Sequence, residues 1–387
     1  MSSTKELVLQ TLISTSNDFI SGQELAKKCG ISRTAIWKAV NSLVNEGYEI
    51  EAVTNRGYRI KKIGNNLTES QLQAFVPKDL NISFKVFEEL DSTILECKRL
   101  CAATPNLYNS DETLTEQGKK LNFHVVLAEK QTAGRGRLGR TFYSPAKNGI
   151  YFSMIYIPEH SVIQPAKMTA TAAVAVCNAI KKVFNLETKI KWVNDIFFNG
   201  KKICGILTEG ITNFETGKIE AAIIGIGINI SQPDSGFPKE IADVAGSLLK
   251  NPPESIKRNE LAAQLAVELA RMYIALEKST LTKAPALTNT STLDNSSASQ
   301  SAPINSIESE ADASAYNAKK IMQEYKNRTF LIGKTVEVSP VIDGNEKYTA
   351  TVLDITDDAA LVVQKTDGSK ITLQSGEVSL LSKNFSF

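Results

Sequence analysis

The chain has 387 residues, which is too long for one ordinary domain and predicts two or three. Hydrophobic residues make up 42% of it and charged residues 22%, which is typical of a soluble globular protein. The formal net charge of +2 gives no overall attraction to nucleic acid, so any DNA contact must come from a local basic patch. No apolar run approaches the roughly 18 residues of a membrane span, and we expect a cytoplasmic protein with no membrane partner.

The cysteines and histidines do not form a recognisable metal-binding pattern. The five cysteines include no CxxC pair, which argues against both a disulfide framework and a zinc site. The two histidines stand apart from any partner motif. We therefore predict no metal site formed by the protein alone.

Residues 1–63 have the pattern of a winged helix-turn-helix domain. Apolar spacing predicts a first helix over Lys5–Ser14. Ser21, with a glutamate three positions later, predicts the start of a second helix that ends at Gly30. Ser32 predicts the start of a third helix. A helix, a tight glycine turn and a further helix form the helix-turn-helix layout.

The third helix and the wing carry the predicted DNA contacts. Gly47–Ile60 alternates like a β-hairpin, and residues 1–63 hold nine Lys/Arg against six Asp/Glu, a surplus of three. Basic residues on the wing suit phosphate contacts, and the start of the third helix suits base edges. A winged helix used only for protein contacts is the alternative, and Trp37 also fits a core position. The residues predicted to meet DNA are Ser21, Ser32, Arg33, Thr34, Trp37, Lys38 and Arg56.

The next segment predicts a strand followed by polar residues at the start of a helix. Ile82–Leu90 predicts a strand, which runs into Asp91–Thr93, and Leu95–Ala103 predicts a helix. Short hydroxyl residues at a helix start serve as N-caps, and the free backbone N–H groups there also bind ligands. The polar stretch Pro105–Lys120 predicts a surface loop.

A stretch rich in glycine and arginine follows the buried strand predicted for Phe123–Ala128. In Gln131–Pro145, QTAGRGRLGRTFYSP, three glycines alternate with Arg135, Arg137 and Arg140. Glycine lets the backbone approach a ligand, and guanidinium groups bind carboxylate and phosphate oxygens in pairs. The stretch, which we call the Arg loop, therefore predicts an anion-binding site. A solvated basic loop or a nucleic-acid contact is the alternative.

Lys191–Glu209, KWVNDIFFNGKKICGILTE, supplies a second candidate segment. It predicts short strands separated by turns at Asn194-Asp195 and Asn199-Gly200, the latter being the strongest hairpin signal in the chain. Lys191 lies beside the first turn and is a candidate site residue. A structural lysine on a strand face is the alternative.

A further strand is predicted over Ile219–Ile230, between helices predicted for Ala166–Phe184 and Leu261–Glu277. Gly225 and Gly227 interrupt its apolar run. Glycines at such positions mark a close approach of a ligand or backbone, or else a β-bulge.

These motifs together resemble those of biotin protein ligases. GRGRLGR, KWVND, GIGIN at Gly225–Asn229 and DST at Asp91–Thr93 fall in the order of that family, and the resemblance covers nearly the whole chain. The N-terminal module makes the chain similar to the bifunctional members that also repress the biotin operon.

The resemblance implies an ATP-dependent, AMP-forming biotin–[biotin carboxyl carrier protein] ligase. Biotin's carboxylate would attack the α-phosphate of ATP, which carries Mg²⁺, to give biotinyl-5'-adenylate, and a lysine of a carboxylase carrier domain would then take the biotin. The site must neutralise charge, so Lys191 and Arg137 are the implied catalytic residues. The family also implies a homodimer, when ligand-bound, that binds operator DNA.

The residues implied to bind biotin or its adenylate come from all of these motifs and their flanks. They are Ser92, Thr93, Ile94, Gln131, Gly134, Arg135, Gly136, Arg137, Arg140, Lys191, Asn194, Asp195, Gly205, Gly225, Gly227 and Asn229. Three positions depart from the family's pattern: Ile94 replaces an asparagine, Val193 a proline and Leu381 an arginine. The change at Val193 relaxes a turn without removing a charge.

We predict an α+β multidomain protein in three parts. A winged helix-turn-helix (1–63) precedes a central mixed-sheet α/β ligase domain (64–330). Within the latter, about 279–315 is rich in Ser, Thr, Asn and Ala without an aromatic residue, which predicts a disordered insertion. Short alternating strands over 331–387 predict an SH3-like β-barrel.

Two other functions fit parts of the sequence. A lipoate-type ligase would share the catalytic fold, but the GRGRLGR loop does not resemble that of lipoate ligases. A ligand-sensing transcription factor with an inactive ligase domain would not need the Arg loop and Lys191. Both features therefore favour an active biotin ligase.

Overall fold

The computed structural model describes residues 4–15, 18–45, 48–62, 66–104, 106–159, 164–213, 217–250, 257–281, 317–339 and 347–380. The insertion predicted for 279–315 lies outside the described residues from 282 onward, and so does Leu381. No helix within these ranges is long and apolar enough to cross a membrane.

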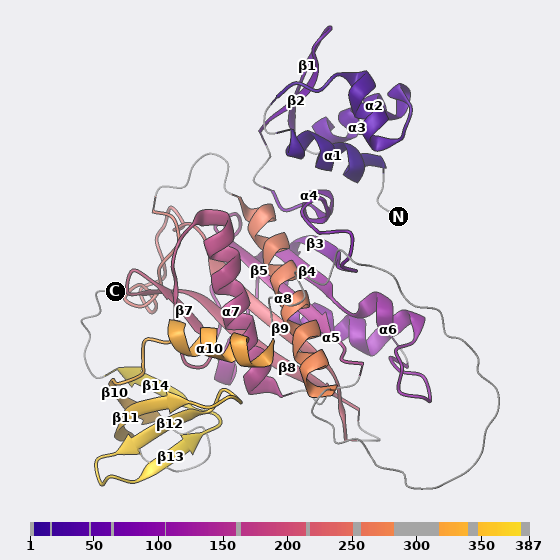
Figure 1. The fold of residues 1–387 in the computed structure, drawn as a ribbon. Helices are drawn as coiled ribbons and strands as arrows, with labels where there is room; N and C mark the ends of the chain where they lie inside the picture. Colours follow the sequence, from indigo (N-terminus) through magenta and orange to yellow (C-terminus); the bar gives the residue numbers. More distant parts are fainter. Residues whose placement is uncertain are drawn as a thin grey trace, which may run out of the picture.

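The N-terminal module has the predicted winged helix-turn-helix order (Figure 1). Ser21 accepts a hydrogen bond from the backbone N–H of Glu24 at the start of the second helix, and Gly30 ends that helix at a φ of 66°. Ser32 accepts the N–H of Ala35 at the start of the third helix. The elements are α1 (Thr4–Ser14), α2 (Gly22–Cys29), α3 (Arg33–Asn45), β1 (Glu49–Val53) and β2 (Gly57–Lys62).

Gly57 joins the wing to the helices. The N–H and C=O of Tyr58 exchange hydrogen bonds of 2.8 and 2.9 Å with those of Ile20. Gly57 has a φ of 100°, and a Cβ there would lie 2.0 Å from the carbonyl oxygen of Ile20. Only glycine therefore fits this position.

A short helix, α4 (Glu69–Ala74), lies between the winged module and the central sheet (Figure 1). It packs against α1. Just before it, the N–H of Leu67 donates to the Glu129 carboxylate at 2.7 Å, and Glu129 is paired at 2.8 Å with the fully buried Arg258. The chain that leaves the winged module is thus tied to the interior of the next domain.

The central sheet has seven strands and is mixed, as predicted. Its first two strands are parallel, and all other neighbours are antiparallel. The order is β3 (Ser83–Leu90), β4 (His124–Gln131), β5 (Gly149–Tyr156), β9 (Ile219–Asn229), β8 (Lys201–Thr212), β7 (Asp195–Phe198) and β6 (Lys189–Lys191).

Helices cover both faces of this sheet. The long helices α7 (Pro165–Phe184) and α8 (Arg258–Leu281) pack on one face, and α5 (Thr93–Ala103) packs on the other (Figure 1). Side chains alternate along β9, because Ile224 and Ile226 join the α7/α8 core whereas Ile223 joins the α5 cluster. Gly225 and Gly227 therefore lie on the α5 face.

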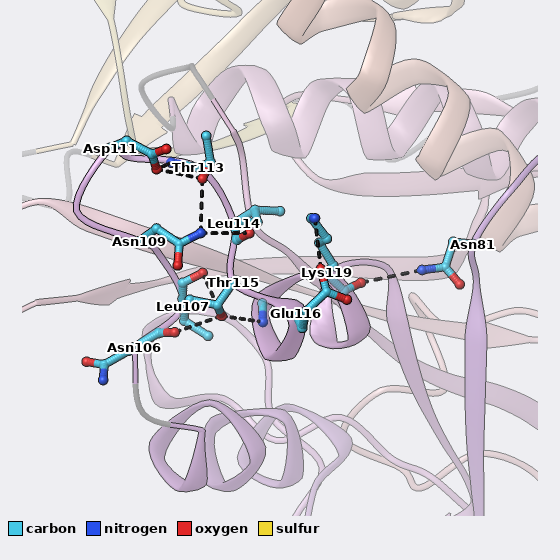
Figure 2. A network of polar contacts seen from close by, with 11 residues as sticks. Asn81, Asn106, Leu107, Asn109, Asp111, Thr113, Leu114, Thr115, Glu116 and Lys119 are labelled. Carbon is cyan, nitrogen blue, oxygen red and sulfur yellow. Dashed lines mark hydrogen bonds and ion pairs between the residues drawn. The ribbon is translucent and has the colours of Figure 1, made fainter. Parts of the chain in front are cut away.

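The polar segment after α5 is more ordered than the surface loop predicted for it. Its hydroxyl and amide groups bond to one another (Figure 2). Asn109 donates to the Thr113 hydroxyl at 3.0 Å, and Thr115 accepts the N–H of Gly118 at 3.0 Å. Thr115 thereby caps a short helix, α6 (Glu116–Leu121).

The C-terminal part follows α10 (Ala318–Arg328) and forms a five-stranded antiparallel sheet. No ladder joins its two outer strands within the described residues, so the structure gives a sheet here, and the SH3-like barrel stays a prediction. The order is β13 (Lys370–Leu373), β12 (Leu361–Lys365), β11 (Tyr348–Ile355), β10 (Thr335–Ser339) and β14 (Glu377–Leu380).

Candidate active site

A pocket of about 310 Å³ lies where α5 begins, between the Arg loop and strands β7, β8 and β9. This volume is within the range of small-molecule sites. Every residue predicted to bind ligand lines the pocket except Gly134 and Lys191. The lining residues that were predicted are Ser92, Thr93, Ile94, Gln131, Arg135, Gly136, Arg137, Arg140, Asn194, Asp195, Gly205, Gly225, Gly227 and Asn229.

Ser92 presents an unused hydroxyl to the pocket. It is the N-cap residue of α5 but makes no side-chain capping bond. Its side chain is only 1% exposed, and its Oγ has no hydrogen-bond partner in the protein. An unpaired buried hydroxyl costs about 1–3 kcal/mol, so its position needs an explanation. Ser92 thus occupies the N-cap position without the side-chain bond of an ordinary N-cap, and a bound ligand would supply the missing partner.

Gln131 holds the neighbouring polar groups in place. Its Oε1 accepts from the N–H of Thr93 at 2.9 Å, and its Nε2 donates to the Ser144 hydroxyl at 2.9 Å. The Thr93 hydroxyl also lies 2.8 Å from that of Ser153. The end of β4, the start of α5 and the end of the Arg loop are thus joined by one side chain.

The two glycines of β9 make room for side chains that form the apolar wall. A Cβ on Gly225 would lie 2.4 Å from Cδ1 of Ile94, and a Cβ on Gly227 would lie 2.4 Å from the ring of Phe142. The ladders from β9 to β5 and β8 run unbroken through both glycines, which excludes the β-bulge alternative. The close approach is therefore made by Ile94 and Phe142.

The Arg loop contacts two other parts of the chain. Arg137 donates to the side-chain oxygen of Asn194 at 3.1 Å and to the carbonyl oxygen of Gly376 at 3.4 Å. Arg140 pairs with Glu377 at 2.7 Å. The loop is thus held between the turn before β7 and strand β14 of the C-terminal sheet.

Lys202 and Arg135 complete the cationic side of the pocket. The Lys202 ammonium lies 2.6 Å from the Asp195 carboxylate. Arg135 lies 3.9 Å from Glu209, which also pairs with Lys98 at 3.2 Å. Each of these cations therefore has a carboxylate neighbour.

Lys191 does not itself line the pocket. It lies on β6, the outermost strand, and β7 and β8 lie between it and β9. Its backbone pairs with that of Asp195 in the ladder, so the two side chains lie on one face of the sheet. Burial lowers the pKa of the Lys191 amine, with Asp195 opposing the shift. The amine also interacts electrostatically with Lys202, Glu377 and Arg140 of the pocket wall, and its catalytic role stays a prediction.

Gly134 and Asn229 also have structural contacts. A Cβ on Gly134 would lie 2.4 Å from the carbonyl oxygen of Phe142, so this glycine permits the close packing at the base of the loop and does not line the pocket. Asn229 lines the pocket, but its side-chain amide donates to the carbonyl of Gly246 at 3.1 Å.

Several lining residues were not predicted, although Phe142, Tyr143 and Cys204 lie within the two segments singled out in the sequence. Lys202 was the one with a usable signal: Lys201 and Lys202 begin a strand after a hairpin turn, and alternation sends one of any two neighbours to each face. The others depend on tertiary packing that no local pattern encodes. They include Phe142, Tyr143, Phe152, Cys204, Phe237, Ile241, Val244 and Glu377.

The pocket offers oxygen ligands but no complete metal cage. The described residues contain no group of three or more His, Cys, Asp or Glu that could hold a metal ion. Asp195, Glu240 and Glu377 do line the pocket. Mg²⁺ commonly binds through one or two carboxylates together with substrate phosphates, and these residues fit that mode.

A second surface lies on the winged module. The residues predicted to meet DNA are all exposed, and Trp37 is 58% exposed, which places it outside the core. Ile36 and Val40 of α3 face inward instead. The Arg56 and Arg59 guanidinium groups each lie 4.5 Å from the centre of the Phe19 ring, so Phe19 fixes two cations on the wing.

The fold and the pocket define a ligase of the biotin and lipoate class with an added DNA-binding module. The Biotin/lipoate A/B protein ligase family matches residues 102–229, an HTH domain matches 4–59, and the Biotin protein ligase C terminal domain matches 331–381. A biotin protein ligase from Aquifex aeolicus in complex with biotin and ATP has a similar fold, with a TM-score of 0.51 and 21% identity over 77% of this chain and 97% of that chain.

Curated relatives identify the family within this class of ligases. The bifunctional ligase/repressor BirA of Bacillus subtilis is 36% identical over 257 residues, which cover 66% of this chain and 74% of the relative. The protein of the same name from Salmonella typhimurium is 27% identical over 288 residues, which cover 74% of this chain and 82% of the relative. The chain belongs to the bifunctional ligase/repressor family of biotin protein ligases.

Proposed function

We propose that this protein links biotin attachment to the control of transcription. It is an ATP-dependent biotin protein ligase that forms biotinyl-5'-adenylate and transfers biotin to a lysine of a carboxylase carrier domain. It is also a DNA-binding repressor. The observation that carries the ligase assignment is the pocket, which combines an unused buried hydroxyl on Ser92 with the cations of the Arg loop and Lys202.

Biotin's ring system is proposed to bind at the Ser92 end. The ring's urea group can both donate and accept hydrogen bonds, which suits Ser92, Thr93 and Gln131. Ile94 and the glycines of β9 provide the apolar wall for the rest of the ring. The carboxylate at the far end of biotin's chain would then reach the cations.

The first step brings one anion against another. Biotin's carboxylate oxygen attacks the α-phosphorus of ATP, the bond to the β-phosphate oxygen breaks, and pyrophosphate leaves. Arg135, Arg137 and Lys202 supply the positive charge that offsets the repulsion. Lys191 is proposed to bridge the carboxylate and phosphate oxygens, because its amine interacts with Asp195 and Arg140 of the pocket wall, and Lys202 adds a second cation beside it.

The second step transfers biotin to the acceptor. The acceptor amine attacks the carbonyl carbon of the mixed anhydride, and AMP leaves with the electrons of the broken C–O bond. The Arg loop covers the adenylate and keeps water out, since a mixed anhydride hydrolyses readily. No covalent bond to the enzyme is needed.

Mg²⁺ enters with ATP and reduces the charge of its phosphates. Asp195 and Glu240 are the residues proposed to contact it, and Asp195 also orients Lys202. Gly136, Arg140, Asn194, Gly205 and Asn229 complete the proposed adenylate site.

DNA binding is proposed for the exposed face of α3 and the wing, with Arg33, Thr34, Trp37 and Lys38 at base edges and Arg56 near phosphates. We further propose a ligand-bound homodimer on a two-fold operator. The proposed domains are 1–63, 64–330 and 331–387, the last of the SH3-like type. We also propose that the enzyme acts in the cytoplasm, where ATP and the acceptor carboxylase are available.

The test is pyrophosphate release from ATP, measured with biotin, with lipoate and with no acid. Release that depends on biotin is expected. Release with lipoate instead would identify a lipoate-type ligase, and release with neither would identify a ligand sensor with an inactive ligase domain.

A further inference from the structure

Residues 230–249 form an irregular segment that closes one end of the pocket. Phe237, Ile241 and Val244 of this segment line the cavity. The Ser92 end of the pocket lies at Gly225, against which Ile94 packs, whereas the segment is bonded to Asn229. Four residues of a strand separate these points by roughly 13 Å. The segment therefore bounds the end of the pocket that is far from the ring site.

The backbone of Lys202 holds this segment through two hydrogen bonds. Its N–H donates to the carbonyl of Val244 at 2.8 Å, and its carbonyl accepts the N–H of Gly246 at 2.8 Å. The Lys202 side chain reaches Asp195 in the pocket. The main chain of one residue thus holds the segment while its side chain supplies a cation.

The side chain of Lys201 makes a second attachment. Its ammonium donates to the carbonyl oxygens of Asp243 at 2.5 Å and Ala242 at 3.4 Å. These carbonyls end a helical turn, in which the N–H groups of Val244 and Ala245 bond to Ile241. Carbonyls at the end of a helical turn carry partial negative charge, which a lysine stabilises.

Gly246 lets the segment lie directly against this lysine. A Cβ on Gly246 would lie 2.4 Å from the Cβ of Lys201. The contact needs glycine on one side and a long cationic side chain on the other. Lys201 is itself exposed, so its loss would leave no buried charge.

We propose that Lys201 is a positioning residue for the adenylation reaction, which latches residues 230–249 so that Phe237, Ile241 and Val244 form the wall of the nucleotide end. This inference rests on the proposed function. Lys201 touches neither substrate nor reacting atoms and acts through the segment. Biotin, bound at the other end, does not depend on the latch.

Lys201→Met tests the latch, and Lys239→Met is the matched control. Lys239 lies on the same segment, is exposed, and does not line the pocket. A lost hydrogen bond to a charged group predicts an increase of about tenfold in the KM for ATP, with the KM for biotin and the Tm unchanged. Lys201→Arg should restore most of the affinity, and Gly246→Ala should reproduce the defect without touching a charge.

Amide hydrogen exchange of residues 242–246 provides a readout that needs no catalysis. It should be faster in Lys201→Met than in the parent protein and unchanged in Lys239→Met. Equal exchange in all three proteins, or a KM for biotin that rises with that for ATP, overturns the latch. If the proposed function itself were wrong, the parent protein would show no biotin-dependent pyrophosphate release.

Discussion

The two ends of the pocket are built on different principles. At the ring end, the buried Thr93 and the half-buried Gln131 are uncharged and held by hydrogen bonds, and one hydroxyl, that of Ser92, is left for a ligand. At the cationic end, Arg140 and Lys202 already contact carboxylates. A ligand would add a missing contact at the first end and would exchange partners at the second.

The ring end is suited to recognising a ligand, whereas the cationic end is suited to movement of the Arg loop. Preorganised uncharged groups bind without rearrangement, so the ring end is suited to selecting the vitamin. The Arg135 and Arg140 side chains are 41% and 68% exposed, and exposed ion pairs contribute about 0–1 kcal/mol. The Arg loop can therefore leave its carboxylates at little cost when a stronger anion arrives.

The largest expected effect follows from removing the cation of Lys191. Lys191→Ala should lower the rate of adenylate formation by about a hundredfold to a thousandfold, because a charge at the reacting oxygens acts mainly in the transition state. Biotin-dependent pyrophosphate release measures this rate. Lys189→Ala on the same strand is the control and should retain most activity, since Lys189 is exposed and does not line the pocket.

Near-normal turnover of Lys191→Ala would refute the role of this amine. If Lys202→Ala were instead the more damaging change, the bridging cation would be Lys202, on the strand nearer the centre of the sheet.

Next in size is the effect of opening the Arg loop. Arg137→Ser removes the contacts with Asn194 and Gly376, and we expect the adenylate to dissociate about tenfold to a hundredfold faster. Rapid filtration followed by detection of free biotinyl-adenylate measures this leak. Arg140→Ser should leak less, because its pair with Glu377 is exposed. Retention equal to the parent in Arg137→Ser would argue against the loop as a lid.

The order of elements could be predicted from the sequence because their signals are local. Ser21 and Gly30 mark the ends of α2, and the two glycines that interrupt the apolar run of β9 mark a close approach of other groups. The Arg loop was found through residue types that suit an anion. The mixed sheet and the ligand role of Ser92 were implied by the resemblance to biotin protein ligases.

The features that the sequence did not reveal come from beyond a hairpin turn or from a distant part of the chain. Lys191 was singled out through its motif and Lys202 was not, yet the hairpin after Asn199 places Lys202 nearer the centre of the sheet and in the pocket lining. Glu377 comes from another sheet, which no local pattern connects with the Arg loop. Closure of a barrel in the C-terminal part depends on pairing between distant strands, which no local pattern encodes, so the SH3-like form stays a prediction.

A substitution at the ring end should have a smaller effect, which weakens biotin binding without lowering the stability. Ser92→Ala is expected to weaken biotin binding about tenfold while leaving the Tm unchanged or slightly higher, because the hydroxyl has no partner in the protein. Ser153→Ala is the contrast: its hydroxyl contacts Thr93, so it should lower the stability by about 1 kcal/mol. Titration calorimetry with biotin and thermal unfolding measure the two quantities. A Tm that falls in Ser92→Ala would mean that the hydroxyl has a structural role.

The smallest effect concerns the pH dependence of stability and tests how strongly burial acts on the amine of Lys191. Burial lowers its pKa below the ordinary 10.5, so within that interval the unfolded chain binds a proton that the folded chain does not. Stability from this group is therefore gained as the pH rises toward 10.5 and lost as it falls through the folded pKa. The difference in unfolding free energy between Lys191→Met and the parent, measured with denaturant from neutral pH upward, should favour the variant most at the lowest pH. A constant difference would show that the amine is well solvated, and Lys191 would then be as open to a ligand as Lys202.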